Sequence, residues 1–263
     1  MNRRDFLLTS VTAATAAALP ALSEADPVNT QAKGKAPSSL PVVAMLVYPE
    51  FTVLDLMGPY QFLSALMGYK VILVSKKKGL IKADTGLTIQ TDASFADCPK
   101  KVAALFIPGG TAGTANAMTD SETIAFVQSR AKDAKVISSV CTGSFILAAA
   151  GLLKGKRATG HWLARDLLKD FGAIPIDERV VKDGNVVTGA GVSAGLDLAL
   201  ELIAELSDDH YAKLCQLWFE YDPHPKFDCG SPSKSTPADV EMLKTMVPTF
   251  RKTLKSIAEK KHA

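Results

Sequence analysis

The chain has 263 residues, which is enough for one large domain or two small ones. Apolar residues make up 47% and charged residues 22%, and these ordinary globular values exclude disordered, collagen-like and fibrous proteins. Thirty basic residues against 27 acidic ones leave a net charge of +3, without a dominant Lys/Arg cluster, which argues against a nucleic-acid partner. Four cysteines are too few for a disulfide framework, although a pairing of Cys215 with Cys229 stays open.

The N-terminus has the pattern of an export signal. Arg3 and Arg4 precede an apolar run, Phe6–Leu22, and a small-x-small cleavage site ends at Ala25. The run is shorter than the roughly 20 residues that a membrane helix needs. We therefore expect a twin-arginine signal peptide over residues 1–25 and a flexible leader over residues 26–40. The mature protein would be periplasmic and would meet the membrane only during export.

From Pro41 onward, short β-rich runs alternate with longer helical runs. In chain order we expect a strand over 42–48, a helix over 57–67, strands over 69–75 and 102–107, a helix over 122–132, a strand over 135–140 and a helix over 143–152. A hairpin with Asp183-Gly184 at its tip follows, and then helices over 192–206 and 238–258. This order predicts one central, mostly parallel sheet with helices on both faces. In such sheets, binding sites form beyond the carboxyl ends of the strands.

The strand end at Cys141 has the residues of a nucleophile elbow. Small neighbours, Thr142-Gly143-Ser144, permit the strained strand-to-helix turn that exposes a nucleophile. The N–H groups of the following helix would stabilise a thiolate and lower the pKa of Cys141. The alternative is a buried structural cysteine.

Two other strand ends carry unusual residues. Asp55 lies between two leucines, just before the helix expected from Met57. It is either a partly desolvated acid or merely the N-cap of that helix. Gly109 and Gly110 end a buried strand, either to aim N–H groups at a ligand or simply to form a tight turn. His161 is close enough in the chain to approach the elbow. No cysteine or histidine has metal-ligand spacing.

Several spaced motifs together resemble the DJ-1/PfpI superfamily, and within it the isonitrile hydratase group. They cover roughly residues 42–232: Tyr48-Pro49, Leu54–Tyr60, Ser94–Pro99, Val140–Leu153, Gly155–Trp162, Glu178–Asn185, Glu220–Pro223 and Gly230–Pro232. The resemblance implies a flavodoxin-like three-layer sandwich, related to class I glutamine amidotransferases, and a homodimer. We expect this domain over residues 41–232, with a helical tail over residues 233–263 packed on it.

The resemblance also implies roles for individual residues. Cys141 would be the nucleophile, Asp55 the general acid and base, and Thr142 a further catalytic residue. Gly109, Gly110, Thr111 and His161 would bind the substrate, without a metal or an organic cofactor. The superfamily's peptidases have His after the nucleophile, so Thr142 argues against peptidase activity. Gly160 and Ala190 stand where the hydratases commonly have Thr and Gly, which leaves the natural substrate open.

The reaction that the resemblance implies is the hydration of an isonitrile to an N-substituted formamide. Cys141 would attack the terminal isonitrile carbon while Asp55 supplies and later removes a proton. The alternatives are an enzyme that acts on another small electrophile, such as a reactive aldehyde, and a non-catalytic redox or stress sensor. We do not expect a DNA-binding regulator, because the roughly 30 residues after Pro232 are too few for a helix-turn-helix module.

Overall fold

The computed structural model of the chain describes residues 40–262. The expected signal peptide and nearly all of the expected leader lie outside the described residues. The chain separates into two units, Met1–Leu40 and Pro41–Ala263, and the second carries every helix and strand described below.

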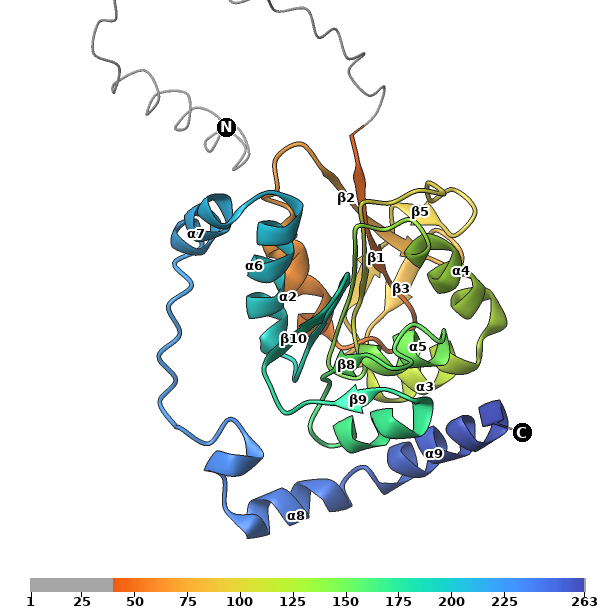
Figure 1. The fold of residues 1–263 in the computed structure, drawn as a ribbon, viewed down its shortest axis with the longest axis vertical. Coiled ribbons are helices and arrows are strands. Elements are labelled where there is room, and N and C mark those ends of the chain that lie inside the picture. The colour runs from red at the N-terminus through yellow and green to blue at the C-terminus, as the bar shows by residue number, and fades with distance from the viewer. Residues whose placement is uncertain (1–39, 263) are drawn as a thin grey trace, which may run out of the picture. The chain divides into compact units, whose positions relative to one another are not determined.

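A seven-stranded sheet forms the centre of the fold (Figure 1). Its order is β10-β11-β7-β6-β1-β2-β5, and every pairing is parallel except that of β10 with β11. The strands are β1 (Val42–Leu46), β2 (Lys70–Ser75), β5 (Ala93–Ser94), β6 (Ala104–Ile107), β7 (Val136–Val140), β10 (Val180–Asp183) and β11 (Val186–Gly189). Strands β1, β6, β7 and β11 are buried along their whole length, which explains their nearly continuous apolar or small residues.

Helices cover both faces of this sheet, as the strand–helix alternation predicts (Figure 1). One layer contains α2 (Val53–Leu63) and α6 (Ala194–Leu206), with α7 (Asp209–Trp218) against α6. The other layer contains α3 (Thr111–Thr119), α4 (Ser121–Ala131) and α5 (Gly143–Ala149). The fold is thus a three-layer, flavodoxin-like sandwich.

The strand order locates the site. From β1 the chain goes outward to β2 and then returns to the other side of β1 to form β6. At such a switch point the connections leave the strands in opposite directions and open a crevice at their carboxyl ends. Asp55 follows β1, Gly109 follows β6 and Cys141 follows β7, so the three candidate segments meet at this crevice.

Two expectations about helices were wrong. Helix α2 begins at Val53, not near Met57, so Asp55 lies inside its first turn and the residue before the helix is Thr52. The helix expected over 238–258 is two helices, α8 (Pro237–Thr245) and α9 (Pro248–His262). Pro248 separates them because proline lacks the N–H that would continue a preceding helix.

Several short elements were not predicted. They are β3 (Leu80–Lys82) paired with β4 (Thr88–Gln90), β8 (Arg157–Ala158) paired with β9 (Ile174–Pro175), and the 3₁₀ helices η1 (Arg165–Phe171) and η2 (Pro232–Lys234). Helix α3 was not predicted either. The sequence of α3, Thr-Ala-Gly-Thr-Ala-Asn-Ala-Met-Thr, has too weak an apolar periodicity to indicate a helix.

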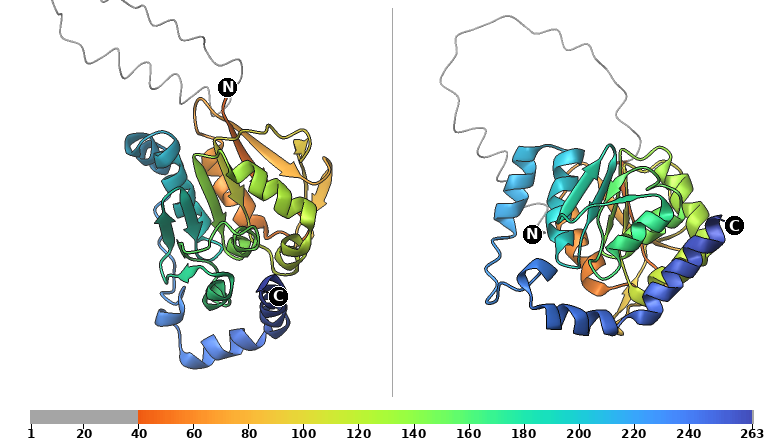
Figure 2. Two further views of the ribbon diagram at one scale, coloured as in Figure 1. Left: turned by 45° about the vertical axis from the view of Figure 1, so that its right-hand side comes forward. Right: turned by 60° about the horizontal axis from the view of Figure 1, so that its bottom comes forward.

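The last helix returns to the body of the domain. Helix α9 packs against α3 and η1, as both views of Figure 2 show, whereas α8 buries none of its residues. The four cysteines are free, with Cys215 fully buried and Cys229 exposed, so the pairing left open by the sequence is not formed. Between residues 40 and 262, no helix combines the length and apolar character needed to cross a membrane.

Candidate active site

Cys141 occupies a strained elbow between β7 and α5. Its φ of 60° is in the left-handed region, which non-glycine residues rarely adopt and which stores about 1–3 kcal/mol. The Cys141 N–H donates to the carbonyl oxygens of Gly189 and Ala190, at 3.1 and 2.8 Å. These bonds hold the elbow to the end of β11, so Ala190, one of the two unusual positions in the sequence, directly supports the cysteine.

Asp55 is a fully buried acid beside this elbow. Its Oδ2 accepts a hydrogen bond from the Gly109 N–H at 2.9 Å, and its Oδ1 has no hydrogen-bond partner among the described residues. The interpretation of Asp55 as a helix cap is wrong, because its bonded partner belongs to the loop after β6 and not to α2. A buried carboxyl oxygen without a partner is favoured only when the acid is neutral or a ligand satisfies it.

The environment raises the pKa values of both groups. Burial raises the pKa of Asp55 from 3.8 to about 7, while the hydrogen bond from Gly109 and the interaction with the Cys141 thiol act in the opposite direction. Burial, and then the charge of Asp55, raise the pKa of Cys141 well above its usual value. The expected lowering of the Cys141 pKa is therefore wrong: the Thr142 N–H does favour the thiolate, but burial and the nearby acid outweigh it.

A buried chain of hydroxyl groups holds Thr142. The Tyr48 hydroxyl donates to the Pro108 carbonyl at 2.7 Å, and burial raises its pKa, so it keeps its proton. Its oxygen therefore accepts from Thr114 Oγ1 at 3.1 Å, and Thr114 in turn accepts from Thr142 Oγ1 at 2.9 Å. The Gly110 N–H donates to Thr142 Oγ1 at 2.9 Å. The Thr142 proton consequently points into the protein, and its oxygen has one lone pair left.

The two glycines allow the loop after β6 to approach the acid and the elbow. A Cβ on Gly109 would lie 2.6 Å from Asp55 Oδ2 and 2.7 Å from the Thr142 nitrogen. A Cβ on Gly110 would lie 2.4 Å from the Glu50 carbonyl oxygen. Real Cβ contacts are essentially never this short. Both glycines are thus required by the close packing of three loops, and Gly109 also donates its N–H to the acid.

A cavity of about 150 Å³ opens at Cys141. Its lining contains Thr52, Gly110, Thr111, Cys141, Thr142, His161, Leu163, Ala164, Val192, Val247 and Phe250. The structure therefore brings together five of the seven candidate residues. Gly109 and Asp55 are not part of this lining, although Asp55 interacts with the Cys141 thiol. A larger cavity, about 320 Å³, lies beside β1 and β2 and has none of the candidate residues in its lining.

His161 lines the cavity as a neutral imidazole. Burial, and secondarily the charge of Arg165, lower its pKa. Its Nδ1 accepts a hydrogen bond from the Leu163 N–H at 3.3 Å, which leaves the proton on Nε2. His161 is thus suited to donate a hydrogen bond to a bound molecule. Its backbone N–H donates to the Cys141 carbonyl oxygen at 3.3 Å. At the preceding Gly160, a Cβ would lie 2.9 Å from the same carbonyl oxygen and 2.5 Å from Ser144 Oγ, so a larger residue there would require the elbow to shift.

Sequence reasoning missed the apolar wall of the cavity. Leu163, Ala164, Val192, Val247 and Phe250 come from three distant parts of the chain. The only sequence signal for Val247 and Phe250 is the apolar periodicity of the C-terminal helix, which indicates burial but not the buried partner. Over residues 40–262, no group of three or more His, Cys, Asp or Glu side chains is placed to hold a metal ion.

A strained cysteine elbow beside a buried acid, at the switch point of a parallel sheet, defines a class of α/β proteins built around one cysteine. The chain belongs to the DJ-1/PfpI family, whose model matches residues 42–205.

Among curated proteins, the isonitrile hydratase of Pseudomonas putida is 45% identical over 210 residues, 80% of this chain and 91% of the relative. A deglycase from Thermococcus kodakarensis is 35% identical over 122 residues, which cover 46% of this chain and 73% of the relative. Among solved structures, a ThiJ/PfpI family protein from Pseudomonas syringae superposes with a TM-score of 0.81 at 46% identity, covering 89% of this chain and 98% of the other. The chain is thus a homologue of isonitrile hydratase in a family that also contains deglycases.

Proposed function

We propose that this protein hydrates isonitriles to N-substituted formamides, with Cys141 as the nucleophile and Asp55 as the proton carrier. The observation that carries the proposal is the pairing of a strained, buried thiol with a buried acid whose pKa is about 7, in a close homologue of isonitrile hydratase. The active form of the pair holds one proton in total, because the acid must accept the thiol proton as the sulfur attacks.

The first step adds the thiol across the terminal isonitrile carbon. Asp55 takes the proton from Cys141, and Sγ forms a bond to the carbon. The same carbon receives the proton, which gives a thioimidate, R–N=CH–S–Cys141. Asp55 is not part of the cavity lining but interacts with the Cys141 thiol, so it acts where the substrate meets the sulfur.

The second step consumes water. Asp55 takes a proton from the water, whose oxygen bonds to the thioimidate carbon, and passes this proton to the nitrogen. The C–S bond then breaks, the hydroxyl proton of the intermediate moves to the sulfur by way of Asp55, and R–NH–CHO leaves. The free lone pair of Thr142 Oγ1 is available to accept a hydrogen bond from the attacking water, and His161 Nε2–H is available to the substrate nitrogen.

The test is incubation of residues 26–263 with cyclohexyl isonitrile, with the formamide followed by chromatography. Formation of the formamide should cease in Cys141→Ala. Cys215→Ala is the matched control, because Cys215 is also a free, buried cysteine but does not line the cavity. Formamide production by Cys141→Ala, or none by the reduced, folded wild-type protein, would refute the proposal.

A second candidate reaction is conversion of another small electrophile, such as a reactive aldehyde. The deglycase from Thermococcus kodakarensis is the observation that favours it. The same thiol–acid pair would then add to a carbonyl carbon. Incubation with glyoxals distinguishes this reaction from hydration, and rapid, selective oxidation of Cys141 by peroxide would instead indicate a redox sensor.

The cellular setting is also a proposal. A twin-arginine signal over residues 1–25 would deliver the folded protein to the periplasm, where it would act as a homodimer on a small molecule, without a nucleic-acid partner or a cofactor. Sedimentation of the mature chain tests the dimer.

A further inference from the structure

The lining of the cavity at Cys141 contains two kinds of residue. Four have polar side chains, namely Thr52, Thr111, Thr142 and His161. The apolar wall includes Val247, which directly precedes α9, and Phe250, which lies in the first turn of α9. A cavity of about 150 Å³ lined in this way has room for only a small apolar group beside the thiol.

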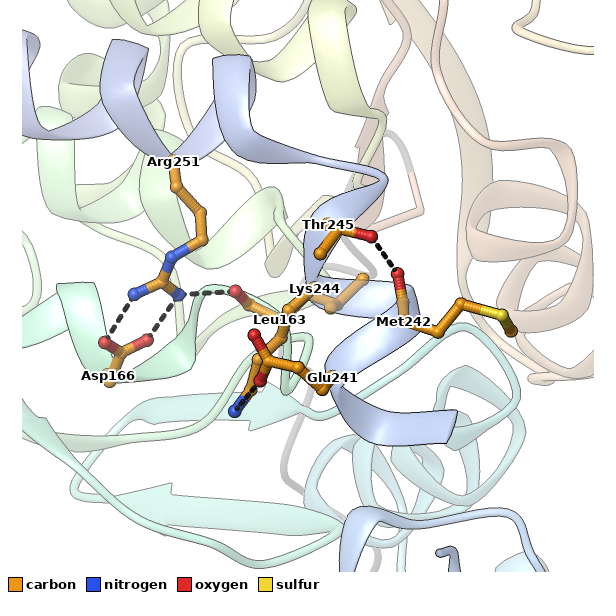
Figure 3. A network of polar contacts seen from close by, with 7 residues as sticks. All are labelled: Leu163, Asp166, Glu241, Met242, Lys244, Thr245 and Arg251. Carbon is orange, nitrogen blue, oxygen red and sulfur yellow. Dashed lines mark hydrogen bonds and ion pairs between the residues drawn. The ribbon is translucent and has the colours of Figure 1, made fainter. Parts of the chain in front are cut away.

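Helix α9 is firmly attached where it forms this wall. Phe250 and Ile257 are each 8% exposed, and Leu254 is fully buried between them. Next to Phe250, the Arg251 guanidinium donates two hydrogen bonds of 2.8 Å to the Asp166 carboxylate and a third to the Leu163 carbonyl oxygen (Figure 3). Leu163 itself lines the cavity. The Arg251 clamp therefore ties together two parts of the same wall.

The start of α9 is thus positioned by packing and by a bidentate ion pair, unlike α8, which buries nothing. A rigid apolar wall can discriminate between substituents by size, because a group too large for the cavity cannot be accommodated by a small shift of a packed helix.

We propose that Val247 and Phe250 are specificity-determining residues that receive the substituent of the substrate and limit its size. The inference rests on the proposed function for the identity of the substrate. The isonitrile group is linear, so when its terminal carbon meets Sγ, the substituent on nitrogen extends away from Cys141. The apolar wall of the same cavity is where an apolar substituent loses its contact with water.

The experiment compares kcat/KM for a bulky isonitrile, 1-adamantyl, with that for a small one, ethyl. In Phe250→Ala, kcat/KM for the bulky isonitrile divided by kcat/KM for the small one should rise about tenfold or more. In Phe250→Trp this ratio should fall. Ile257→Ala is the matched control, because Ile257 lies on the same helix with the same exposure but does not line the cavity. It should leave the ratio unchanged, since loss of stability affects both substrates equally.

A second assay tests the role of the apolar wall even if the protein does not hydrate isonitriles. Cys141 is alkylated with iodoacetamide or with N-(1-naphthyl)iodoacetamide, and the rates are measured on the peptide that contains Cys141. If Phe250→Ala selectively increases the rate of alkylation by the naphthyl reagent, the inference about the wall is supported even when no formamide forms. Absence of the formamide would then refute the hydration proposal alone. Equal ratios in Phe250→Ala and Ile257→Ala in both assays would overturn the inference.

Discussion

Asp55 is the residue whose chemistry depends most on its surroundings. In water its carboxyl group would be charged at neutral pH, but burial raises its pKa to about 7. At physiological pH the thiol–acid pair therefore passes between a doubly protonated state and a state with one shared proton. The proposed reaction needs the second state.

This titration predicts a pH dependence. The rate of Cys141 alkylation, and kcat/KM for a substrate, should rise with pH through about 7 and then reach a plateau, because Asp55 must be ionised to accept the thiol proton. In Asp55→Asn the inflection near pH 7 should disappear and turnover should be lost. An unchanged inflection in Asp55→Asn would assign the titration to another group.

The same pKa shift predicts an effect on stability. Because folding raises the pKa of Asp55 from 3.8 to about 7, the folded state binds this proton more tightly than the unfolded state does. The contribution of Asp55 to stability is therefore fully present below pH 4 and is lost as the pH rises through 7. At about 1.4 kcal/mol for each pKa unit, the loss is at most about 4 kcal/mol.

Asp55→Asn has no carboxyl group to ionise. Its free energy of unfolding should therefore rise relative to that of the wild type when the pH is raised from 4.5 to 8. Urea unfolding of residues 26–263 at the two pH values measures the difference. Asp222→Asn, which removes an exposed carboxylate, is the control and should show no comparable change. An equal pH dependence in wild type and Asp55→Asn would contradict the assigned pKa.

Three elements are connected at the site by one chain of hydroxyl groups. Tyr48 follows β1, Thr114 belongs to α3, and Thr142 precedes α5. Each group donates its single proton to the next, from Thr142 to the Pro108 carbonyl. The chain thus fixes both the position of α3 against the sheet and the direction of the Thr142 hydroxyl.

Thr114→Val removes the middle member of this chain at nearly constant volume. We expect a loss of about 1–3 kcal/mol in stability, because two buried hydroxyl groups lose a partner. We also expect kcat/KM to fall about tenfold, because the Thr142 hydroxyl then keeps only the Gly110 carbonyl oxygen, at 3.3 Å, as an acceptor and is held less firmly. Thr114→Ser keeps the hydroxyl and should restore kcat/KM even if it unfolds as easily. Equal kcat/KM values in the two variants would show that the chain of hydroxyl groups has no role in the reaction.

At the scale of the whole chain, we propose that an N-terminal export signal acts after the rest of the protein has folded. The folded unit begins at Pro41, and the expected export signal precedes it. A twin-arginine route accepts folded cargo, so the elbow and the acid would already be assembled before the protein crosses the membrane.

Replacement of both Arg3 and Arg4 by lysine should therefore abolish export without changing the folded unit. Fractionation of cells that express the full chain should show wild-type protein in the periplasm, processed to begin at Asp26, and the double variant in the cytoplasm with its N-terminus intact. Activity of the two should be equal in lysates. Processing of the double variant at the same site would contradict the twin-arginine assignment.

Local patterns determined much of this protein. The short runs of apolar or small residues in β1, β6 and β7 indicate strands buried on both faces, and their alternation with helices predicts the three-layer sandwich. The Asp183-Gly184 turn predicts the β10–β11 hairpin, which the structure confirms. The small residues around Cys141 predict the elbow, because such a tight turn does not tolerate larger side chains. These features depend on neighbours in the chain, which a sequence displays directly.

Tertiary structure alone decided the electrostatics and the boundary of the site. The pKa values of Asp55 and Cys141 follow from mutual proximity and burial, which outweigh the local helix N-terminus that the sequence displays. The place of Phe250 in the cavity lining depends on where the C-terminal helix packs, more than a hundred residues after the elbow. Burial and contact between distant segments are properties of the packed chain, and no local pattern encodes them.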